Sequence, residues 1–196
     1  MKHISIYNTK NLYMIRVGES KFSVKKLFCL ALYYGFARYL PVSYFPVIGS
    51  TCKWIRYQLC RRIFKKCGRN VNIERLAFFG GGRFLEVGDN SGLGINCFVP
   101  SNTIIGNDVM MGPNCHILPS NHAFDRTDIP MWKQGHTELK QTIIEDDVWI
   151  GRDVLMTPGR LIKRGSIVAG GCVLCKDFPE YSIIGGNPAK LIRSRK

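Results

Sequence analysis

Two tracts, VGDNSGLGINCFVPSNTIIGNDVMMGPNCHI (residues 87–117) and IEDDVWIGRDVLMTPGRLIKRGSIVAGGCVL (residues 144–174), decide the fold of this 196-residue chain. In each tract an aliphatic residue returns at every sixth position without a break. These anchors of the repeat are Val87, Leu93, Val99, Ile105, Met111 and Ile117, then Ile144, Ile150, Met156, Ile162, Val168 and Leu174. A buried helix face repeats about every 3.6 residues and a strand face about every two, so a period of six fits neither.

A second position of the repeat, four residues after most anchors, holds a small or branched side chain, as at Cys97, Thr103, Val109 and Cys115. Such a hexapeptide is typical of a solenoid, in which each repeat forms one short side of a parallel β-coil. We therefore predict an all-β solenoid with three sides per turn, in which Cys97 stacks on Cys115. Because cysteines in these slots act as small apolar residues, the eight cysteines indicate a reducing, cytoplasmic setting.

The positive charge of the chain, +14 in total, lies almost entirely in its first third. Residues 1–75 contain 15 Lys and Arg and two acids, whereas residues 76–196 contain 13 and 12. The basic segment shows no nucleic-acid recognition motif. The first 20 residues lack the apolar core of a secretory signal, so we expect the protein in the cytoplasm.

Within this basic third, residues 27–37 are apolar all round but too short to cross a bilayer, which needs about 20 such residues. Residues 52–67 predict a basic amphipathic helix, with Ile55, Leu59 and Ile63 on its apolar face and Arg56 among the basic residues elsewhere. Two interpretations of residues 24–67 stay open, and both can hold together. The segment attaches to an anionic membrane surface, at the inner face of the cytoplasmic membrane, or it caps the open end of the solenoid.

The repeat breaks once, between Ile117 and Ile144. Residues 121–142 are polar and have no period, so they must leave the coil as a loop. Loops of this length are usually functional or disordered, and the aromatic Phe124 and Trp132 favour a functional one. The chain then divides into an N-terminal, partly helical extension (1–70), a β-helix with its extruded loop (71–178) and a C-terminal segment (179–196). In the last of these, Asn187 and Pro188 predict the start of a closing helix, Ala189–Arg195.

The repeat tract, SNHAFDRTDIPM (residues 120–131), VWIG (148–151) and IIGGNPAKLIR (183–193) together resemble the hexapeptide-repeat acyltransferases. Within that family they are most similar to the sugar O-acetyltransferases that act on galactosides, maltose and colanic acid. The resemblance covers about residues 70–196. It implies a left-handed β-helix that assembles as a homotrimer and binds acetyl-CoA between neighbouring subunits, without a metal. The implied reaction is acetyl transfer to a hydroxyl of a sugar or cell-surface glycan precursor, in polysaccharide biosynthesis.

The resemblance places the catalytic base at His122, the third residue of the loop motif. A neutral imidazole can take the proton of an acceptor hydroxyl as that hydroxyl attacks the thioester directly, in a ternary complex. On the acceptor side we expect Asn96 and Asp125. Asp125, three residues after His122, is also placed to orient its imidazole, although it fits a solvated carboxylate equally well. His116 is expected on the surface, and His136 in a structural or acceptor-side position.

For the donor the resemblance implies seven cofactor-binding residues: Trp149, Arg152, Gly170, Cys175, Lys176, Lys190 and Arg193. A small residue such as Gly170 leaves room for the pantetheine arm, and fixed cations such as Lys176 suit the phosphates. Two of the seven depart from the family pattern, since Arg152 stands where relatives carry a small residue and Cys175 replaces a threonine.

Arg160 is a third departure, because it occupies an inward slot of the coil that normally holds valine. A buried guanidinium without a partner is costly. We therefore predict that Arg160 turns outward and distorts its coil, or that a carboxylate meets it.

Two other functions stay open on the sequence alone. A metalloenzyme like the γ-class carbonic anhydrases would need three histidines that converge at a subunit interface, for which His116, His122 and His136 are the candidates. A non-catalytic trimeric β-helix would bind a partner protein or a membrane. Within the enzyme interpretation, an antibiotic is an alternative acceptor, because antibiotic acetyltransferases share this coil.

Overall fold

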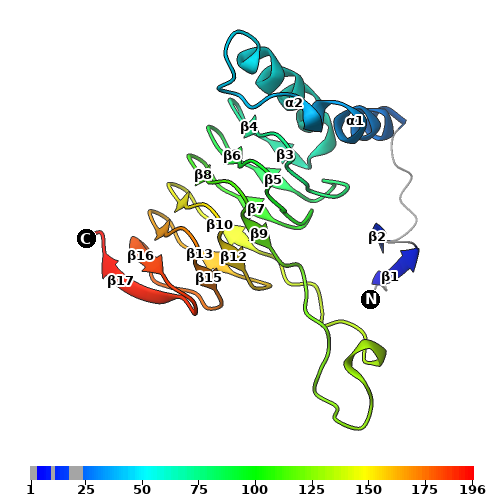
Figure 1. Ribbon diagram of the computed structural model, residues 1–196, viewed down its shortest axis with the longest axis vertical. Helices are drawn as coiled ribbons and strands as arrows, with labels where there is room; N and C mark the ends of the chain where they lie inside the picture. Colours follow the sequence, from blue (N-terminus) through cyan, green and yellow to red (C-terminus); the bar gives the residue numbers. More distant parts are fainter. Residues whose placement is uncertain (1–3, 10–11, 18–23) are drawn as a thin grey trace.

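The chain folds as a left-handed parallel β-helix with two helices at its N-terminal end (Figure 1). The computed structural model describes residues 4–9, 12–17 and 24–196. The N-terminal elements are the antiparallel strands β1 (Ile4–Thr9) and β2 (Leu12–Val17), α1 (Val24–Gly35), the short 3-10 helix η1 (Ala37–Tyr39) and α2 (Gly49–Ile63). The predicted solenoid is therefore confirmed.

The coil strands turn from one side of a three-sided prism to the next about every six residues. They are β3 (Lys66–Cys67), β4 (Asn72–Ile73), β5 (Glu86–Val87), β6 (Gly92–Leu93), β7 (Ile104–Ile105), β8 (Met110–Met111), β9 (His116–Ile117), β10 (Ile143–Ile144), β11 (Trp149–Ile150), β12 (Leu155–Met156), β13 (Leu161–Ile162), β14 (Ile167–Val168), β15 (Val173–Leu174) and β16 (Ser182–Gly185). The 3-10 helix η2 (Met131–Lys133) lies in the loop, and β17 (Lys190–Ser194) ends the chain. The coil begins at β3, ahead of the start predicted near Val71.

The strands stack into three parallel faces. Face 1 has the order β13-β10-β7-β5-β3, face 2 the order β17-β16-β14-β11-β8, and face 3 the order β15-β12-β9. Strands β4 and β6 continue face 2 toward the N-terminus, since the Gly92 N–H donates to the Val109 carbonyl (3.1 Å).

The anchors of the hexapeptide repeat fill the prism, and each is buried except Met111, which is half-buried. Cys97 and Cys115 stack in the interior as predicted, with both sulfur atoms 3.2 Å from the Gly112 carbonyl oxygen. The corners need left-handed backbone, which Asn tolerates, and Asn96 has φ of 54° there. Its side-chain amide donates to the Oδ1 of Asn114 on the next coil (3.0 Å). The buried anchors inside the prism and the asparagine contacts at its corners therefore follow the same repeat.

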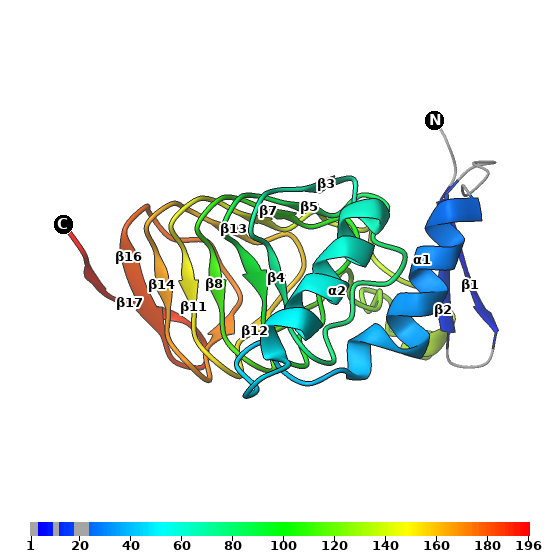
Figure 2. The ribbon, with the colours of Figure 1, turned by 90° about the horizontal axis from the view of Figure 1, so that it is seen from above.

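Helices α1 and α2 lie side by side over the first coil (Figure 2). The buried Tyr33 donates from its hydroxyl to the Ala77 carbonyl (2.9 Å), and Tyr34 donates to the Gly80 carbonyl (2.8 Å). The ring centroid of Phe79 in the first coil lies 4.6 Å from the ring centroid of Tyr33. The helices thus cover the open end of the prism, and we call residues 24–64 the cap.

Arg56 on α2 is fully buried between the cap and the coil. Its Nε donates to the Ile73 carbonyl (2.5 Å), and its Nη1 donates to the carbonyls of Leu40 (3.2 Å) and Pro41 (2.8 Å). Its Nη2 lies 3.6 Å from the Glu74 carboxylate. The sequence pattern places Arg56 outside the apolar face of α2, yet the structure buries it. Its partners come from segments that the local pattern of α2 does not include.

Glu74 is the acidic partner in this buried network. Its carboxylate accepts the Ser43 backbone N–H (3.1 Å), the Ser43 hydroxyl and the Asn72 side-chain amide (2.9 Å). Burial alone raises the pKa of Glu74, but these hydrogen bonds and the charge of Arg56 outweigh it. They hold the pKa of Glu74 below its ordinary value.

This lowered pKa predicts an acid-sensitive contribution to stability. The unfolded chain binds the proton more readily, so the contribution is complete above the ordinary carboxyl pKa of about 4.3 and is lost as the pH falls through the lower pKa of the folded state. We expect the free energy of unfolding, measured by urea titration, to fall less steeply between about pH 5 and pH 3 in Glu74→Gln than in the unmutated protein. The exposed Glu138→Gln is the control and keeps the original slope, whereas equal slopes in all three proteins would contradict the prediction.

The C-terminal helix predicted for Ala189–Arg195 is wrong, since residues 190–194 form strand β17. The chain reverses at Gly186 and the cis Asn187–Pro188 bond and then pairs antiparallel with β16. Asn-Pro is a turn signal as well as a helix start. The free edge of β16 offers backbone hydrogen bonds to the returning segment, which local helix signals do not take into account.

Arg160 meets a carboxylate, as the sequence predicts for an arginine in an inward slot. Its Nη1 lies 3.4 Å from an Asp177 oxygen and donates to the Cys175 carbonyl (3.0 Å). Its Nη2 donates to the Pro158 carbonyl (3.3 Å). The Arg160 side chain is 19% exposed.

Within the described residues, none of the helices has both the length and the apolar character needed to span a membrane.

Candidate active site

The long loop leaves the prism after β9 and returns at β10, on the edge between faces 3 and 1 (Figure 1). We call this edge, which also contains residues 157–160 and 175–178, the loop edge. Two backbone hydrogen bonds close the neck of the loop. The Ala123 N–H donates to the Gly135 carbonyl (3.0 Å), and the Thr137 N–H donates to the Asn121 carbonyl (2.8 Å).

His122 lies in this neck, opposite His136 in an antiparallel bridge. Both residues are exposed, and their ring centroids are 4.3 Å apart with 34° between the ring planes. In the described part of the chain no hydrogen bond or ion pair joins His122 to Asp125, so the residue beside the imidazole is His136. The loop therefore presents two adjacent imidazoles to solvent on a defined backbone.

Hydrogen bonds within the loop hold its tip in a defined conformation. The Gln134 amide accepts the Arg126 N–H (3.0 Å) and donates to the carbonyls of Arg126 (2.8 Å) and Ile129 (3.1 Å). Arg126 also pairs with Asp128, and this hydrogen bond lowers the pKa of the Asp128 carboxyl. These contacts tie the tip together.

Most of the candidate donor residues lie elsewhere on the prism. Trp149 is exposed on face 2, and Arg152 and Gly170 follow on the edge between faces 2 and 3, which we call the second edge. A Cβ atom at Gly170 would lie 3.3 Å from the Arg152 carbonyl oxygen, so the absent side chain keeps this edge open. Arg152 itself pairs with Asp153 (3.0 Å).

Cys175 and Lys176 are exposed on the loop edge, where the Lys176 Nζ lies 5.4 Å from the centroid of the Phe178 ring. Lys190 and Arg193 are exposed on β17, which lies beside β16 at the end of face 2. Within one protomer the predicted residues are thus divided. His122, Cys175 and Lys176 belong to the loop edge, and the other donor residues belong to face 2 and the second edge.

Asn96 lines a hollow of about 240 Å³ on the outside of face 3. The hollow also contains the stacked rings of Phe78 and Phe98, whose centroids are 5.4 Å apart, and His116, whose ring centroid is 6.2 Å from that of Phe98. Arg38 from the cap completes it, with its guanidinium 5.8 Å from the Phe78 ring. Sequence reasoning missed Arg38, Phe78 and Phe98, because only the stacking of coils brings them together.

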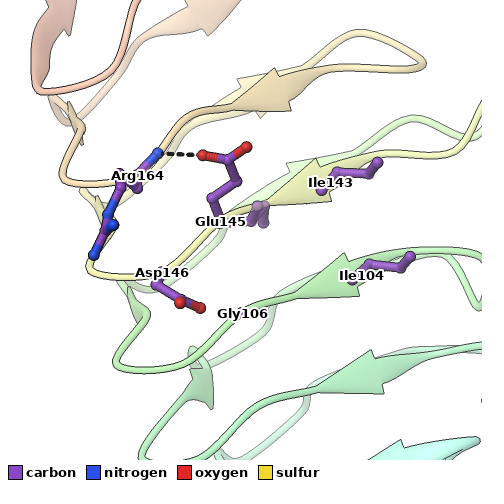
Figure 3. Close-up of a pocket in the computed structure, with 7 residues that line it drawn as sticks. Ile104, Gly106, Ile143, Glu145, Asp146 and Arg164 are labelled. Carbon is purple, nitrogen blue, oxygen red and sulfur yellow. Dashed lines mark hydrogen bonds between the residues drawn. The ribbon is translucent and has the colours of Figure 1, made fainter.

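A second hollow, of about 370 Å³, lies on face 1 and contains Glu145, Asp146 and Arg164 (Figure 3). Its carboxylates have structural partners. Glu145 accepts the backbone N–H of Arg164 (2.8 Å), and Asp146 accepts that of Asn107 (2.6 Å). This hollow is lined by none of the predicted site residues, and its acids hold coil turns in place.

Within one protomer the three histidines of the carbonic-anhydrase alternative lie in two separate places. His116 lies on β9 against Phe98, whereas His122 and His136 lie together in the loop. No set of three His, Cys, Asp or Glu side chains suited to a metal ion occurs among the residues that the structure describes.

Comparison with known proteins agrees with the coil. No family model matches the sequence. The Saccharomyces cerevisiae protein named "Putative acetyltransferase YJL218W" is 32% identical over 138 residues, which cover 69% of each chain. The structure of a maltose O-acetyltransferase from Clostridium difficile superposes with a TM-score of 0.68 at 25% identity, over 88% of this chain and 87% of that one.

A hexapeptide-repeat acetyltransferase from Vibrio cholerae, solved with acetyl coenzyme A, superposes with a TM-score of 0.55 at 26% identity, over 72% of this chain and 76% of that one. The resemblance drawn from the hexapeptide tract and the loop motif is therefore confirmed. The chain is an acetyltransferase and belongs to the hexapeptide-repeat acetyltransferase family.

Proposed function

We propose that this enzyme transfers the acetyl group of acetyl-CoA to a hydroxyl of a sugar or cell-surface glycan precursor. The observation that carries the proposal is the exposed imidazole of His122, fixed in the neck of an ordered loop. The maltose O-acetyltransferase and the acetyl-CoA complex among the similar structures support the acceptor class and the donor.

His122 acts as the general base in this proposal. Its imidazole takes the proton of the acceptor hydroxyl as the hydroxyl oxygen attacks the thioester carbonyl carbon. The carbon–sulfur bond then breaks, and the imidazolium returns the proton to the leaving thiolate, which gives free CoA and the acetyl ester. No acetyl-enzyme forms, because both substrates are bound together. His136, beside His122, limits the positions open to the imidazole.

The donor lies along the bare second edge, where Gly170 gives the pantetheine arm close access to the backbone. Trp149 lies beside the pantetheine arm on one side of the second edge, and Arg152 borders the arm. Lys176, Lys190 and Arg193 supply cations for the phosphates, with Cys175 beside Lys176.

The division of the site supports a homotrimer. His122 is on the loop edge of one protomer, whereas Trp149 and Gly170 are on its face 2 and second edge. Two neighbouring protomers bring the loop edge of one against the second edge of the other, and this completes the site. Three copies around an axis parallel to the prism give each protomer both kinds of neighbour.

The hollow around Asn96 supports a sugar acceptor, because flat aromatic surfaces such as Phe98 suit the apolar side of a sugar ring. Asp125 adds a carboxylate further along the loop. We place the enzyme in the cytoplasm, at the inner face of the membrane where cell-surface glycan precursors are assembled.

An assay of CoA release tests the proposed function. The purified enzyme is given acetyl-CoA and, in separate reactions, hexoses, amino sugars, nucleotide sugars and chloramphenicol, and the free thiol is measured. We expect thiol release with at least one saccharide, together with an acetyl ester in the product by mass spectrometry. Thiol release with chloramphenicol alone would favour the antibiotic alternative. The absence of thiol release with every acceptor would contradict the proposal.

A further inference from the structure

Helix α1 is apolar on the side that points away from the protein as well as on its packed side. The packed side contains the buried Cys29 and Tyr33. The other side exposes large apolar side chains at helical spacing: Val24 (81% exposed), Leu27 (50%), Phe28 (63%), Leu32 (39%) and Phe36 (57%). An amphipathic surface helix would place polar residues there, and contiguous exposed apolar surface of this kind marks an interaction site.

The charge around this apolar side is of one sign. The cap (residues 24–64) contains seven Lys and Arg and no acid, and one of the seven, Arg56, is buried against Glu74. Lys25 on α1 is exposed, as are Arg61 and Arg62 at the end of α2. The cap therefore combines exposed apolar side chains with a cationic rim.

We propose that this outer side of α1 docks on an anionic lipid surface. Apolar side chains enter the boundary between headgroups and acyl chains, and the basic rim neutralises anionic headgroups. A second copy of the chain is a poor occupant, because two such caps repel one another. Nucleic acid suits the charge but gives aliphatic side chains such as Val24 and Leu27 nothing apolar to bury against.

The position of the cap suits this docking. Helix α1 lies at the opposite end of the molecule from β17 (Figure 2). In the proposed trimer the three prisms are parallel, so three caps lie in one plane and bind one membrane together. Linked sites bind far more tightly than each does alone. The inference rests on the proposed function only for this avidity and for its purpose, which is access to a lipid-linked acceptor.

Flotation with lipid vesicles tests the proposal on the full-length protein. Vesicles of phosphatidylcholine are compared with vesicles that also contain about 30% phosphatidylglycerol. We expect binding to the anionic vesicles alone, with a loss of about tenfold or more when salt rises from about 50 mM to about 500 mM. No binding at low salt would overturn the proposal.

The variant Val24→Ser/Phe28→Ser removes the two most exposed apolar side chains of α1, and we expect it to lower vesicle binding by about tenfold or more. The matched control is Phe124→Ser/Trp132→Ser, which removes two comparably exposed residues (61% and 75%) from the loop and should bind vesicles as the unmutated protein does. Unchanged binding of the α1 variant would overturn the proposal. A change in its oligomer mass without lipid, by analytical ultracentrifugation, would instead assign the surface to protein contact.

The two proposals fail in distinguishable ways. The α1 variant keeps its activity on a soluble acceptor if it is folded, and His122→Ala keeps its vesicle binding. A defect in both measurements in the α1 variant, with an altered circular dichroism spectrum, would mean misfolding. In that case the single substitution Phe28→Gln, which disturbs the helix less than the double variant, is tested by the same flotation assay.

Discussion

The variant His122→Ala is expected to lower kcat for acetyl transfer by about a hundred- to ten-thousandfold. The reason is that His122 is the proposed base on the ordered neck of the loop, and alanine has no group to take the proton of the acceptor hydroxyl. The KM for acetyl-CoA should stay the same, because His122 is not one of the residues proposed to bind the donor. The measurement is thiol release at saturating acetyl-CoA, with the best saccharide from the acceptor assay.

Two further variants show whether the loss belongs to the imidazole. Lys133→Ala changes an exposed residue at the loop tip, whose contact is with the Trp132 ring, and should keep activity within about twofold. His136→Ala should give an intermediate loss, because His136 positions the neighbouring ring but does not touch the acceptor proton. If His122→Ala retained full activity, the proposed base would be wrong, and the non-catalytic interpretation of the coil would gain support.

The second large effect is on stability, where Arg56→Met is expected to lower the free energy of unfolding by about 3–5 kcal/mol. Methionine fills much of the volume of the arginine side chain, but it leaves the buried Glu74 carboxylate without its cationic neighbour. It also leaves the carbonyls of Ile73 and Pro41 without their donor. Each of these groups is costly to bury unpaired. Urea-induced unfolding, followed by circular dichroism, measures the change.

A matched control for this variant lies on the same helix. Arg62→Met removes an exposed guanidinium whose hydrogen bond is to the carbonyl of Gln58, one turn earlier, and its effect should stay within about 0.5 kcal/mol. Equal destabilisation by the two variants would mean that the buried network is not what holds the cap on the coil. The double variant Arg56→Met/Glu74→Leu should recover part of the loss, since an apolar pair can replace a buried ion pair.

The coil could be predicted because its rule is local. Each hexapeptide places an aliphatic anchor such as Ile150 or Val168 toward the interior, whatever the rest of the chain does. The end of the chain could not be predicted in this way. Residues 190–194 pair with the free edge of β16, and that edge exists only after the coil has formed.

The candidate site was predictable residue by residue but not as an arrangement. The loop motif singled out His122, and the break in the period showed where the loop leaves the wall. The ring of His136 beside it and the hollow formed by Phe78, Phe98 and Asn96 arise from stacking between positions far apart in sequence. Arg56 shows the same limit, because a charged residue on a helix is recognised as buried only when its partners are known.

The wall of the prism is continuous behind the long loop. Strand β9 pairs with β12 and β10 pairs with β7. Leu118 and Thr142 still bond to neighbouring coils, so the backbone ladder between coils leaves out residues 119–141. Since the entropy of closing a loop rises only slowly with its length, this insertion can be lengthened, shortened or exchanged while the scaffold stays intact. A single continuous graft could therefore give the enzyme a different substrate range and leave the machinery that handles the acyl donor unchanged.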